Sequence, residues 1–521
     1  MSDAGSLSRR VRRRQEAARA EDESGSSLSR RERRRLAAAR GDGARRLPVL
    51  LTVFSALLVL ALADSGPQTG AGEGRLTAGG SSLLPTADDG GALTSTWYCA
   101  AGTAAPGGAA DLSLVLANAG EQERQGTVTW VPAGAERVIS PVTVGSRSSV
   151  RLLARDAVEA PLVSAVVELS GGDVAVEHVV ESSRGRAAAA CASAPSTHWY
   201  LANGSTARDA VESLVLFNPF PDDAIVDISF ATEQGRAEPE PLQSLLVPAG
   251  LSRVAELSAV GPLRREVTAT EVVARSGRVV VDRLQAFNAS EGRTGISLTL
   301  AAPSPALSWT FPVGVQTEEG AQRWHVFNPG DQEAIVSIEV VLDRGDPPEP
   351  AELSVLPHSQ VSFPTEAAGF PLPVGVGHVA TVRSLNGVPV VAERELDVRG
   401  TAPGAGWSSM LGAPVGAERW VLAYGSEGVD ETVTVANTGP DPVSVLIRRL
   451  VDGQAVAIDG LDTVELLPAG RTTLEVPASP PGGGADALLT VLVEADGPVA
   501  VERRLTGAGV GATSALGIPL S

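Results

Sequence analysis

Several residue types are scarce in this chain of 521 residues, and each scarcity narrows what the protein can be. Two cysteines leave little material for a disulfide-dense scaffold or a cysteine-rich metal cluster. Aromatic residues make up 4% of the chain, and all 42 basic residues are arginine, without one lysine. We interpret the missing lysine as codon bias in a GC-rich genome, and we therefore expect no special guanidinium chemistry from the arginines.

The chain also lacks the short motifs of common enzymes and metal sites. It contains no Gly-x-Ser-x-Gly elbow, Walker loop, His-Glu-x-x-His, Cys-x-x-Cys or Asp-x-Asp-x-Asp-Gly calcium loop. Its five histidines fall at unrelated offsets: His178, His198, His325, His358 and His378. We therefore expect no enzyme activity, no cofactor, and no catalytic, cofactor-binding or metal-binding residues.

The composition favours a folded chain built from strands. Hydrophobic residues make up 43% and charged residues 20%, so the chain as a whole is not disordered. Its 56 glycines and 36 prolines, with few aromatics, suit short strands joined by turns better than long helices. The length is enough for several ordinary domains.

The first 63 residues indicate a membrane anchor. Residues 1–46 hold 14 arginines and 7 acids, which leaves a formal charge of −26 on the rest. Residues 47–63 carry no charge and are just long enough to span a bilayer as a helix. The positive-inside rule then predicts a single-pass cell-membrane protein with a cytoplasmic N-terminus and an extracytoplasmic C-terminal bulk.

Two alternatives to the anchor stay open. The Ala-Leu-Ala sequence before Asp64 fits a signal-peptidase site, so secretion after cleavage near Ala63 is the first. A buried core helix is the second. Residues 64–94, rich in Gly, Ser, Thr and Asp, are predicted to be a flexible linker.

The arginine-rich tail is expected to face anionic lipids or to bind a cytoplasmic protein. Clustered arginines can also bind nucleic acid, but no aromatic residue or folded module accompanies them, so no nucleic-acid partner is predicted.

The remainder of the chain repeats four times with a period near 105. A tryptophan followed five residues later by glycine opens each copy: Trp97, Trp199, Trp309 and Trp420. An alternating segment then ends in an asparagine: Asn118, Asn218, Asn328 and Asn437. A later segment contains an acid: Glu177, Asp282, Glu393 and Glu502. The copies are assigned to residues 95–195, 196–303, 304–414 and 415–521.

Roughly seven or eight short strands per copy are typical of an immunoglobulin-like β-sandwich. A propeller blade would need a period of only ~40–50 residues. We therefore predict an all-β fold, with four tandem immunoglobulin-like β-sandwich repeats in a rod after one N-terminal transmembrane helix.

The recurrent residues are assigned structural roles. The asparagines suit a turn because Asn tolerates positive φ and can bond the following backbone. The tryptophans are predicted to plug each core, with carbohydrate stacking as the alternative. Trp130 and Trp407 lie outside that register, and Trp407 is a candidate for exposure. The acids are expected to pair across strands or to be solvated, with a calcium site as the alternative.

Cys99 and Cys191 fall in the first and last predicted strands of the first copy. The aligned residues of later copies are Leu201, Phe311 and Leu422 for Cys99, and Thr299, Met410 and Ala515 for Cys191. Because an exported protein meets an oxidising compartment, we predict a Cys99–Cys191 disulfide. Two free buried thiols are the alternative.

The Leu-Ser-Arg-Arg-Glu-Arg-Arg run at residues 28–34, the single anchor and the Trp97-Tyr98-Cys99 opening carry a family resemblance. The chain resembles an uncharacterised actinobacterial family of membrane-anchored extracytoplasmic β-repeat proteins, of the domain of unknown function 5719 type. The resemblance implies a Gram-positive envelope and transfers no activity or site residue.

Three functions are therefore compared. The first is a non-catalytic cell-envelope protein with a structural or interaction role and an unknown envelope protein or glycan as partner. The second is a glycan-binding or enzyme-accessory protein of the cell-wall machinery. The third, catalysis, would require carboxylates from different copies to meet in an inter-domain cleft.

Overall fold

The structure, a computed structural model, describes residues 83–105, 108–318, 320–366, 370–400, 404–425, 429–451, 453–458, 463–476, 488–507 and 511–521. The predicted tail, the predicted span at 47–63 and the first part of the predicted linker lie outside these residues. Within them, no helix has the length and apolar character that crossing a bilayer requires.

Antiparallel strands make up nearly all the regular structure. The first repeat contains β1 (Thr94–Cys99), β2 (Asp111–Asn118), β3 (Arg124–Pro132), β4 (Val138–Val144), β5 (Ser148–Leu153), η1 (Ala154–Asp156), β6 (Val163–Ser170), β7 (Val174–Ser182) and β8 (Gly185–Ala190). The second contains β9 (His198–Leu201), β10 (Ala210–Phe217), β11 (Ala224–Thr232), β12 (Gly235–Ala237), η2 (Glu240–Leu242), β13 (Leu245–Val247), β14 (Ser252–Glu256), α3 (Leu257–Val260), β15 (Thr268–Ser276), β16 (Val280–Asn288) and β17 (Thr294–Leu300).

The other two repeats have corresponding elements. The third contains β18 (Ser308–Phe311), β19 (Gly320–Asn328), β20 (Ala334–Leu342), β21 (Ala351–Val355), β22 (Ser359–Pro364), β23 (His378–Ser384), β24 (Val391–Val398) and β25 (Gly406–Leu411). The fourth contains β26 (Ala417–Leu422), β27 (Asp430–Asn437), β28 (Val443–Val451), β29 (Gln454–Ala457), β30 (Val464–Leu466), β31 (Arg471–Val476), β32 (Thr490–Gly507), β33 (Gly511–Leu516) and β34 (Ile518–Pro519).

All four repeats share one topology. In the first, one sheet has the order β1-β6-β3-β4 and the other has the order β5-β2-β7-β8. The second and third repeats have the same orders, as β9-β15-β11-β12 with β14-β10-β16-β17, and as β18-β23-β20-β21 with β22-β19-β24-β25. In the fourth, the long strand β32 belongs to both sheets, because it pairs with β26 and β28 and also with β27 and β33. The prediction of an all-β chain is confirmed.

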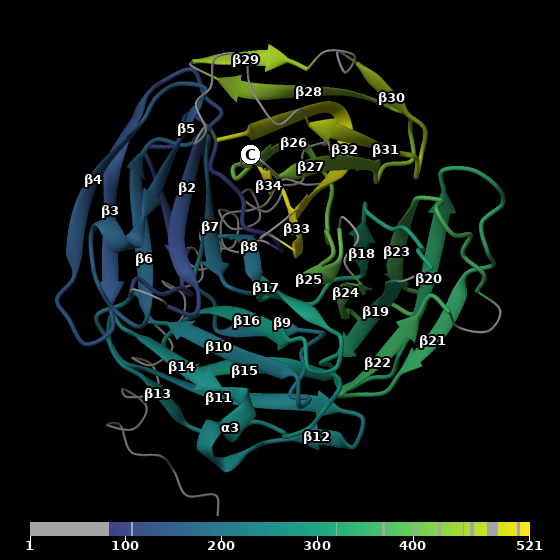
Figure 1. Ribbon diagram of the computed structural model, residues 1–521, viewed down its shortest axis with the longest axis horizontal. Coiled ribbons are helices and arrows are strands. Elements are labelled where there is room, and N and C mark those ends of the chain that lie inside the picture. Colours follow the sequence, from purple (N-terminus) through teal and green to yellow (C-terminus); the bar gives the residue numbers. More distant parts are fainter. Residues whose placement is uncertain are drawn as a thin grey trace, which may run out of the picture. The chain divides into compact units, whose positions relative to one another are not determined.

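The repeats close into a ring, so the predicted rod is wrong (Figure 1). Arg503 on β32 of the fourth repeat binds Glu177 on β7 of the first. Strands β8, β17, β25 and β33, one from each repeat, contact one another around the centre. A sequence period reveals the number of copies, but the angle between successive copies depends on contacts made by residues about a hundred positions apart.

Small residues allow the central strands to approach closely. Gly295 in β17 has a φ of 137°, and a Cβ added there would lie 2.7 Å from the carbonyl oxygen of Trp407 in β25 of the next repeat. Trp407 is 1% exposed and packs edge-to-face on Phe287, with ring centroids 4.7 Å apart. The expectation that Trp407 is exposed is therefore wrong.

The start of the folded ring reaches back into the predicted linker. Ala87 is fully buried; its N–H donates to Pro519 (2.9 Å), and its carbonyl accepts from Ser521 (3.0 Å). Residues near the two ends of the ring thus pair with each other. The predicted flexible linker is wrong from residue 83 onward, because hydrogen bonds to a distant segment order this stretch.

The recurrent tryptophans plug the cores as predicted, and each is at most 2% exposed. In three copies the indole N–H donates to a backbone carbonyl of the acid-bearing segment: Trp199 to Val279, Trp309 to Val390 and Trp420 to Val499. The indole N–H of Trp97 has no partner among the described residues.

The recurrent asparagines bracket a turn with their side chains. Asn118 Nδ2 donates to the carbonyl of Gln122 (2.7 Å), and its Oδ1 accepts from the N–H of Gly120 (2.9 Å). Asn218, Asn328 and Asn437 make the same two bonds. The predicted bonding to the backbone is confirmed, but none of the four has positive φ. The hydrogen bonds, rather than a left-handed backbone, explain the asparagine.

The predicted Cys99–Cys191 disulfide is present, with a Cα–Cα distance of 4.7 Å. The assignment of residues equivalent to Cys191 is wrong by two positions. Four residues make the same N–H bond to the acid-bearing strand: Cys191, Ala301, Gly412 and Gly517. Each copy ends in a proline (Pro195, Pro303, Pro414 or Pro519), and the first copy has two more residues than the others between the aligned position and that proline.

This corrected alignment explains how the other copies manage without a disulfide. They place a large residue opposite a small one, as in Phe311 with Gly412 and Leu422 with Gly517. A Cβ added at Gly412 would lie 2.9 Å from the Phe311 ring. The disulfide therefore fills a space that a large and a small apolar residue fill elsewhere, since core positions keep their total volume.

Candidate functional site

Each of the four recurrent acids is fully buried and lies at a junction between two repeats. The acid always contacts the repeat that precedes its own around the ring. The base that follows it in the sequence contacts the next repeat. Successive residues of a strand face opposite sides, so one strand can link both neighbours.

Three junctions are arginine–glutamate pairs. Arg283 Nη2 lies 2.7 Å from Glu393 Oε2, Arg394 Nη2 lies 2.5 Å from Glu502 Oε1, and Arg503 Nη2 lies 2.8 Å from Glu177 Oε2. The first two are bidentate, with second bonds of 3.2 and 2.9 Å. Charge-assisted bidentate pairs are among the stronger polar contacts in proteins.

The fourth junction uses histidine and aspartate. His178 Nε2 lies 3.0 Å from Asp282 Oδ2, and both side chains are fully buried. The other nitrogen of the imidazole, His178 Nδ1, lies 3.4 Å from the sulfur of Cys191. The disulfide of the first repeat and its junction with the second are therefore in contact.

Backbone N–H groups also donate to each acid, although Oδ1 of Asp282 has no partner among the described residues. Asp282 accepts from Ala100 and Ala101 (both 3.1 Å), and Glu177 accepts from Ala423 and Tyr424 (3.0 and 3.1 Å). The corresponding donors are Ala202 and Asn203 for Glu393, and Val313 alone for Glu502. Pro312 occupies the place of the missing donor and has no N–H.

These contacts explain two sequence landmarks, the opening tryptophan with its glycine and the recurrent acid. The N–H donors lie between the opening tryptophan and the glycine five residues later, and their acceptor is the acid of the next copy. The acids are structural, but they are buried rather than solvated, and their pairing is between repeats. They also lie at four separate junctions, so they do not form one calcium site.

Two further buried acids were missed by the sequence analysis. Glu212 and Glu431 are 0% and 2% exposed, and none of their carboxylate oxygens has a hydrogen-bond partner in the described part of the chain. Burial raises the pKa of each to about 8, although Arg283 and Arg503 respectively act in the opposite direction. A signal was present, since both lie six residues before the recurrent asparagine, where the third copy has Gln322.

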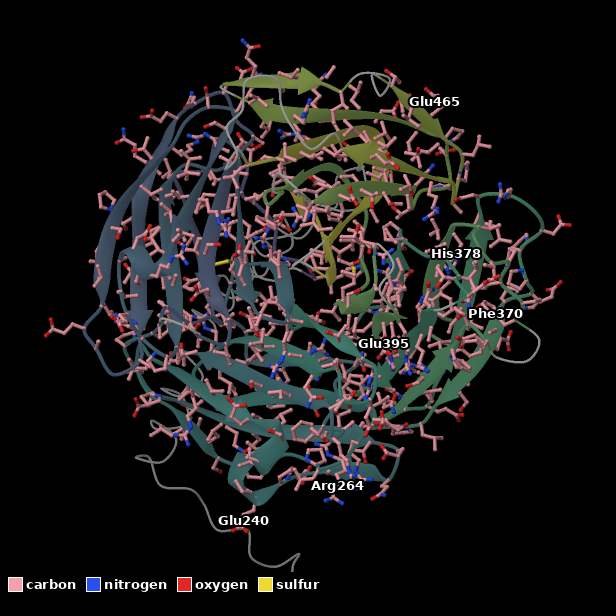
Figure 2. The ribbon with its side chains drawn as sticks, viewed as in Figure 1. Glu240, Arg264, Phe370, His378, Glu395 and Glu465 are labelled. Carbon is pink, nitrogen blue, oxygen red and sulfur yellow. A yellow bond between two sulfur atoms is a disulfide. The ribbon has the colours of Figure 1, made fainter. Side chains whose placement is uncertain are left out.

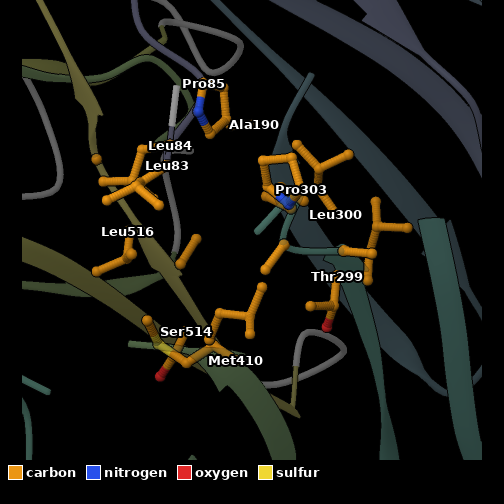
Figure 3. A pocket seen from close by; sticks show the side chains of 18 of the residues that line it. Leu83, Leu84, Pro85, Ala190, Thr299, Leu300, Pro303, Met410, Ser514 and Leu516 are labelled. Carbon is orange, nitrogen blue, oxygen red and sulfur yellow. The ribbon is translucent and has the colours of Figure 1, made fainter. Parts of the chain in front are cut away.

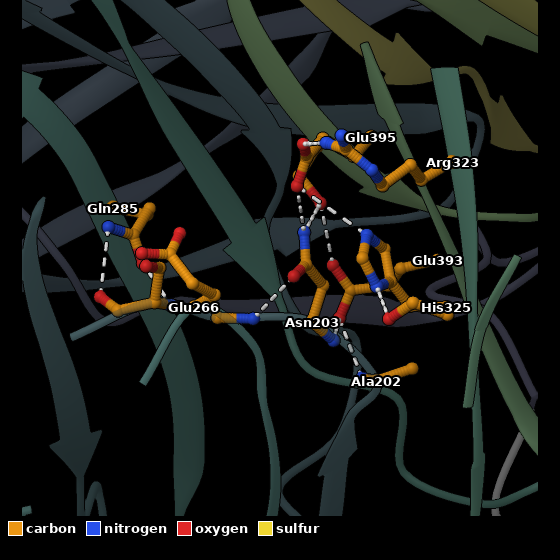
Figure 4. A network of polar contacts seen from close by, with 12 residues as sticks. Ala202, Asn203, Glu266, Gln285, Arg323, His325, Glu393 and Glu395 are labelled. Carbon is orange, nitrogen blue, oxygen red and sulfur yellow. Dashed lines mark hydrogen bonds and ion pairs between the residues drawn. The ribbon is translucent and has the colours of Figure 1, made fainter. Parts of the chain in front are cut away.

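The junction of the second and third repeats contains a larger polar network (Figure 4). Asn203 Nδ2 donates to Ser409 (3.1 Å) and Glu395 (3.3 Å), and His325 Nε2 lies 3.5 Å from Glu395. Burial alone would raise the pKa of Glu395, but His325, with Arg323 and Asn203, lowers it to about 2.

Some ionisable side chains are buried inside the repeats, and others are exposed at the outer edge of the ring (Figure 2). His378 and Glu395 are buried inside the third repeat, whereas Glu240 and Arg264 are exposed on the second. Burial lowers the pKa of His378 to about 4, helped by Arg471 and Arg394.

A cavity of about 80 Å³ lies where the central strands meet. Leu83, Leu84 and Pro85 face it from the start of the ring, together with Leu300 and Leu516 (Figure 3). Its lining is mostly aliphatic, so it offers few groups for chemistry.

A polar cleft of about 460 Å³ lies between the first and fourth repeats. Arg419 is 3.9 Å from both Asp173 and Glu494, and Arg448 is 2.6 Å from Glu494. The charged residues that line it are Asp89, Glu121, Arg147, Asp173, Arg419, Arg448 and Glu494. The arginines can donate hydrogen bonds to a polar ligand, and the carboxylates can accept hydrogen bonds from it.

Comparison with known proteins identifies a family for part of the chain. Residues 154–355 match the model of a family of unknown function, DUF5719. This part of the chain is similar to that family. The match confirms the predicted resemblance to the domain of unknown function 5719 type, and it runs from the middle of the first repeat through the second into the third. The actinobacterial origin and the membrane anchor stay predictions.

Other comparisons add little. No curated protein matches the chain. A solved structure, the crystal structure of a tetra-tandem repeat in the extending region of a large adhesion protein, covers 82% of this chain and 100% of its own at 13% identity. Its TM-score of 0.09 is too low to indicate a shared fold.

Replacing Arg394 with alanine should destabilise the protein strongly, because Glu502 would remain buried without its partner. We expect Arg394→Ala to lower the free energy of unfolding by about 3–5 kcal/mol. Arg383 is the matched control: it is 53% exposed and lies 3.8 Å from Glu339. Arg383→Ala should cost less than about 1 kcal/mol. Urea unfolding of both variants checks this, and equal losses would contradict it.

Replacing Glu212 with glutamine should stabilise the protein at high pH only. The carboxyl keeps its proton up to a pKa of about 8 in the folded chain, against 4.5 for an ordinary glutamate. Its contribution to stability is therefore complete below pH 4.5 and is lost as the pH rises toward 8. We expect Glu212→Gln to gain on the order of 4 kcal/mol at pH 8 and nothing at pH 4.5. Exposed Glu352→Gln, the control, should show no such dependence in pH-dependent urea unfolding.

Proposed function

We propose that this protein is a non-catalytic component of the cell envelope that presents a rigid ring of four β repeats as a structural or interaction platform. The observation that carries the proposal is the use of the recurrent charged residues. Each acid and each base is bound by a neighbouring repeat at a fully buried junction. These groups therefore join the repeats and are not open to a substrate.

The catalytic hypothesis loses its support for the same reason. It requires carboxylates from different copies to meet in a cleft. Glu212 lies near Glu393, and Glu431 lies near Glu177, so pairs do approach each other. All four are at most 2% exposed, which closes them to any substrate in the folded chain.

The membrane placement in this proposal rests on the sequence. The arginine-rich tail and the apolar stretch at 47–63 favour a single span, with the ring outside the cell. The disulfide is consistent with an oxidising compartment.

We also propose an immunoglobulin-like architecture for each repeat. The pairs β2–β5 and β3–β6 correspond to the B–E and C–F strand pairs of that fold. Strand β7 pairs with β2, where the immunoglobulin order would place it beside β6. The proposal therefore concerns the two-sheet sandwich and not the full strand order.

Protease treatment of intact cells tests the placement and the role. We expect added protease to remove a tag fused after Ser521 and to leave a tag before Met1 intact, whereas permeabilised cells should lose both. Chemical crosslinking of the same cells should then give a discrete protein adduct that survives digestion of the wall glycan. Protection of both tags in intact cells would contradict the proposed topology, and an absence of adducts would contradict the interaction role.

Glycan binding is a second candidate, favoured by the polar cleft between the first and fourth repeats. Sugar hydroxyls both donate and accept hydrogen bonds, and the cleft offers arginines and carboxylates side by side. Because Arg419 and Arg448 are about one-third exposed, they can bind a ligand without unfolding the junction.

Retention on purified peptidoglycan tests this candidate. The double variant Arg419→Ala/Arg448→Ala should bind about tenfold more weakly, because two charge-assisted hydrogen-bond donors are lost. Arg383→Ala, on the surface of the third repeat, should bind like the unaltered protein. Equal retention of all three proteins would rule out the cleft as a glycan site.

A further inference from the structure

Three residues that commonly ligate soft metal ions meet in the first repeat. Cys99, His178 and Cys191 are fully buried, and one ligand atom from each lies within 4.8 Å of the other two. The two sulfurs are joined as a disulfide in this structure, so they are not free to bind a metal. The question is what this cluster becomes when that bond is reduced.

The histidine is already placed as a metal ligand. His178 Nδ1 lies 3.4 Å from the sulfur of Cys191. A zinc ion with Zn–S of about 2.3 Å and Zn–N of about 2.0–2.1 Å at tetrahedral angles holds sulfur and nitrogen about 3.6 Å apart. The observed distance is close to that value, so the cysteine and histidine need little movement to share one ion.

The second ring nitrogen has the partner that a metal-binding histidine usually has. His178 Nε2 lies 3.0 Å from Asp282 Oδ2, and that oxygen also accepts from the N–H groups of Ala100 and Ala101. A carboxylate on the far nitrogen fixes the tautomer with Nε2 protonated, which leaves the Nδ1 lone pair directed at the sulfurs. Asp282 therefore acts as an outer partner and not as a ligand.

The corresponding positions in the other repeats cannot bind a metal. His178 is replaced there by Arg283, Arg394 and Arg503, and the cysteine positions are taken by the apolar pairs Leu201 with Ala301, Phe311 with Gly412, and Leu422 with Gly517. The only junction of the ring that uses histidine is thus the one beside the two cysteines. In the described chain, histidine therefore occurs at the junction beside the cysteine pair, and arginine occurs at the three junctions beside apolar pairs.

We propose that the reduced protein binds one zinc ion through the Cys99 and Cys191 thiolates and His178 Nδ1. A dithiol reductant cleaves the Cys99–Cys191 bond, takes up the disulfide itself and leaves two thiols. Zn²⁺ then displaces the two thiol protons, and water fills the fourth position of the tetrahedron. Two thiolates and one imidazole favour zinc over calcium or magnesium, which prefer oxygen ligands.

This proposal predicts a metal content that depends on the state of the cysteines. Full-length protein is reduced with dithiothreitol, desalted without oxygen, and titrated with Co²⁺ or Zn²⁺. We expect about one ion per reduced chain and none per oxidised chain, with thiolate-to-cobalt absorption bands in the Co²⁺ form. Asp282→Asn should weaken binding by about 10–100-fold, because the outer carboxylate is lost.

Two variants separate metal binding from general folding. Cys99→Leu/Cys191→Ala restores the apolar pair of the second repeat, so it should fold and bind no ion. His198→Gln removes an exposed histidine outside the cluster and should bind like the unaltered chain. The proposal is overturned if a reduced chain with two free thiols and an unchanged circular dichroism spectrum binds no metal. It is equally overturned if the Leu/Ala variant or the oxidised chain binds as well as the reduced chain.

Discussion

The ring depends on one interaction, a buried carboxylate that accepts hydrogen bonds from the repeat before it. An ionised carboxylate away from water is costly unless every oxygen is bonded. At three junctions an arginine and one or two backbone N–H groups meet that need, and they come from a different repeat than the acid. The paired base and the backbone donors of each acid always belong to other repeats, so each repeat requires its neighbours, although Ser409 also donates to Glu393 within the third repeat.

This requirement explains why four copies form a closed ring. In an open row, the first copy would leave Glu177 without its arginine, and the last would leave Arg503 without its carboxylate. Closure pairs these two ends through the 2.8 Å contact between them. The pairing of Ala87 with Pro519 and Ser521 adds backbone hydrogen bonds between segments near the two ends of the ring.

The junctions are similar but not identical, and the differences follow from local chemistry. Pro312 removes one N–H donor at one junction, and histidine replaces arginine at another. Glu212 and Glu431 each add a carboxyl that burial keeps neutral up to a pKa of about 8. Since the family match covers residues 154–355, it includes the whole second repeat and the His178–Asp282 contact.

The sequence by itself determined the features that repeat or that follow strand alternation. These are the four all-β copies, the buried tryptophans, the asparagine turns and the disulfide, because each depends on residues within one copy. The tertiary structure alone decided that the copies form a ring, that the acids bind the preceding copy, and that His178 lies between the disulfide and Asp282. The partners in these contacts are about a hundred residues apart or more, and no local pattern of hydrophobic or charged residues records which surfaces meet.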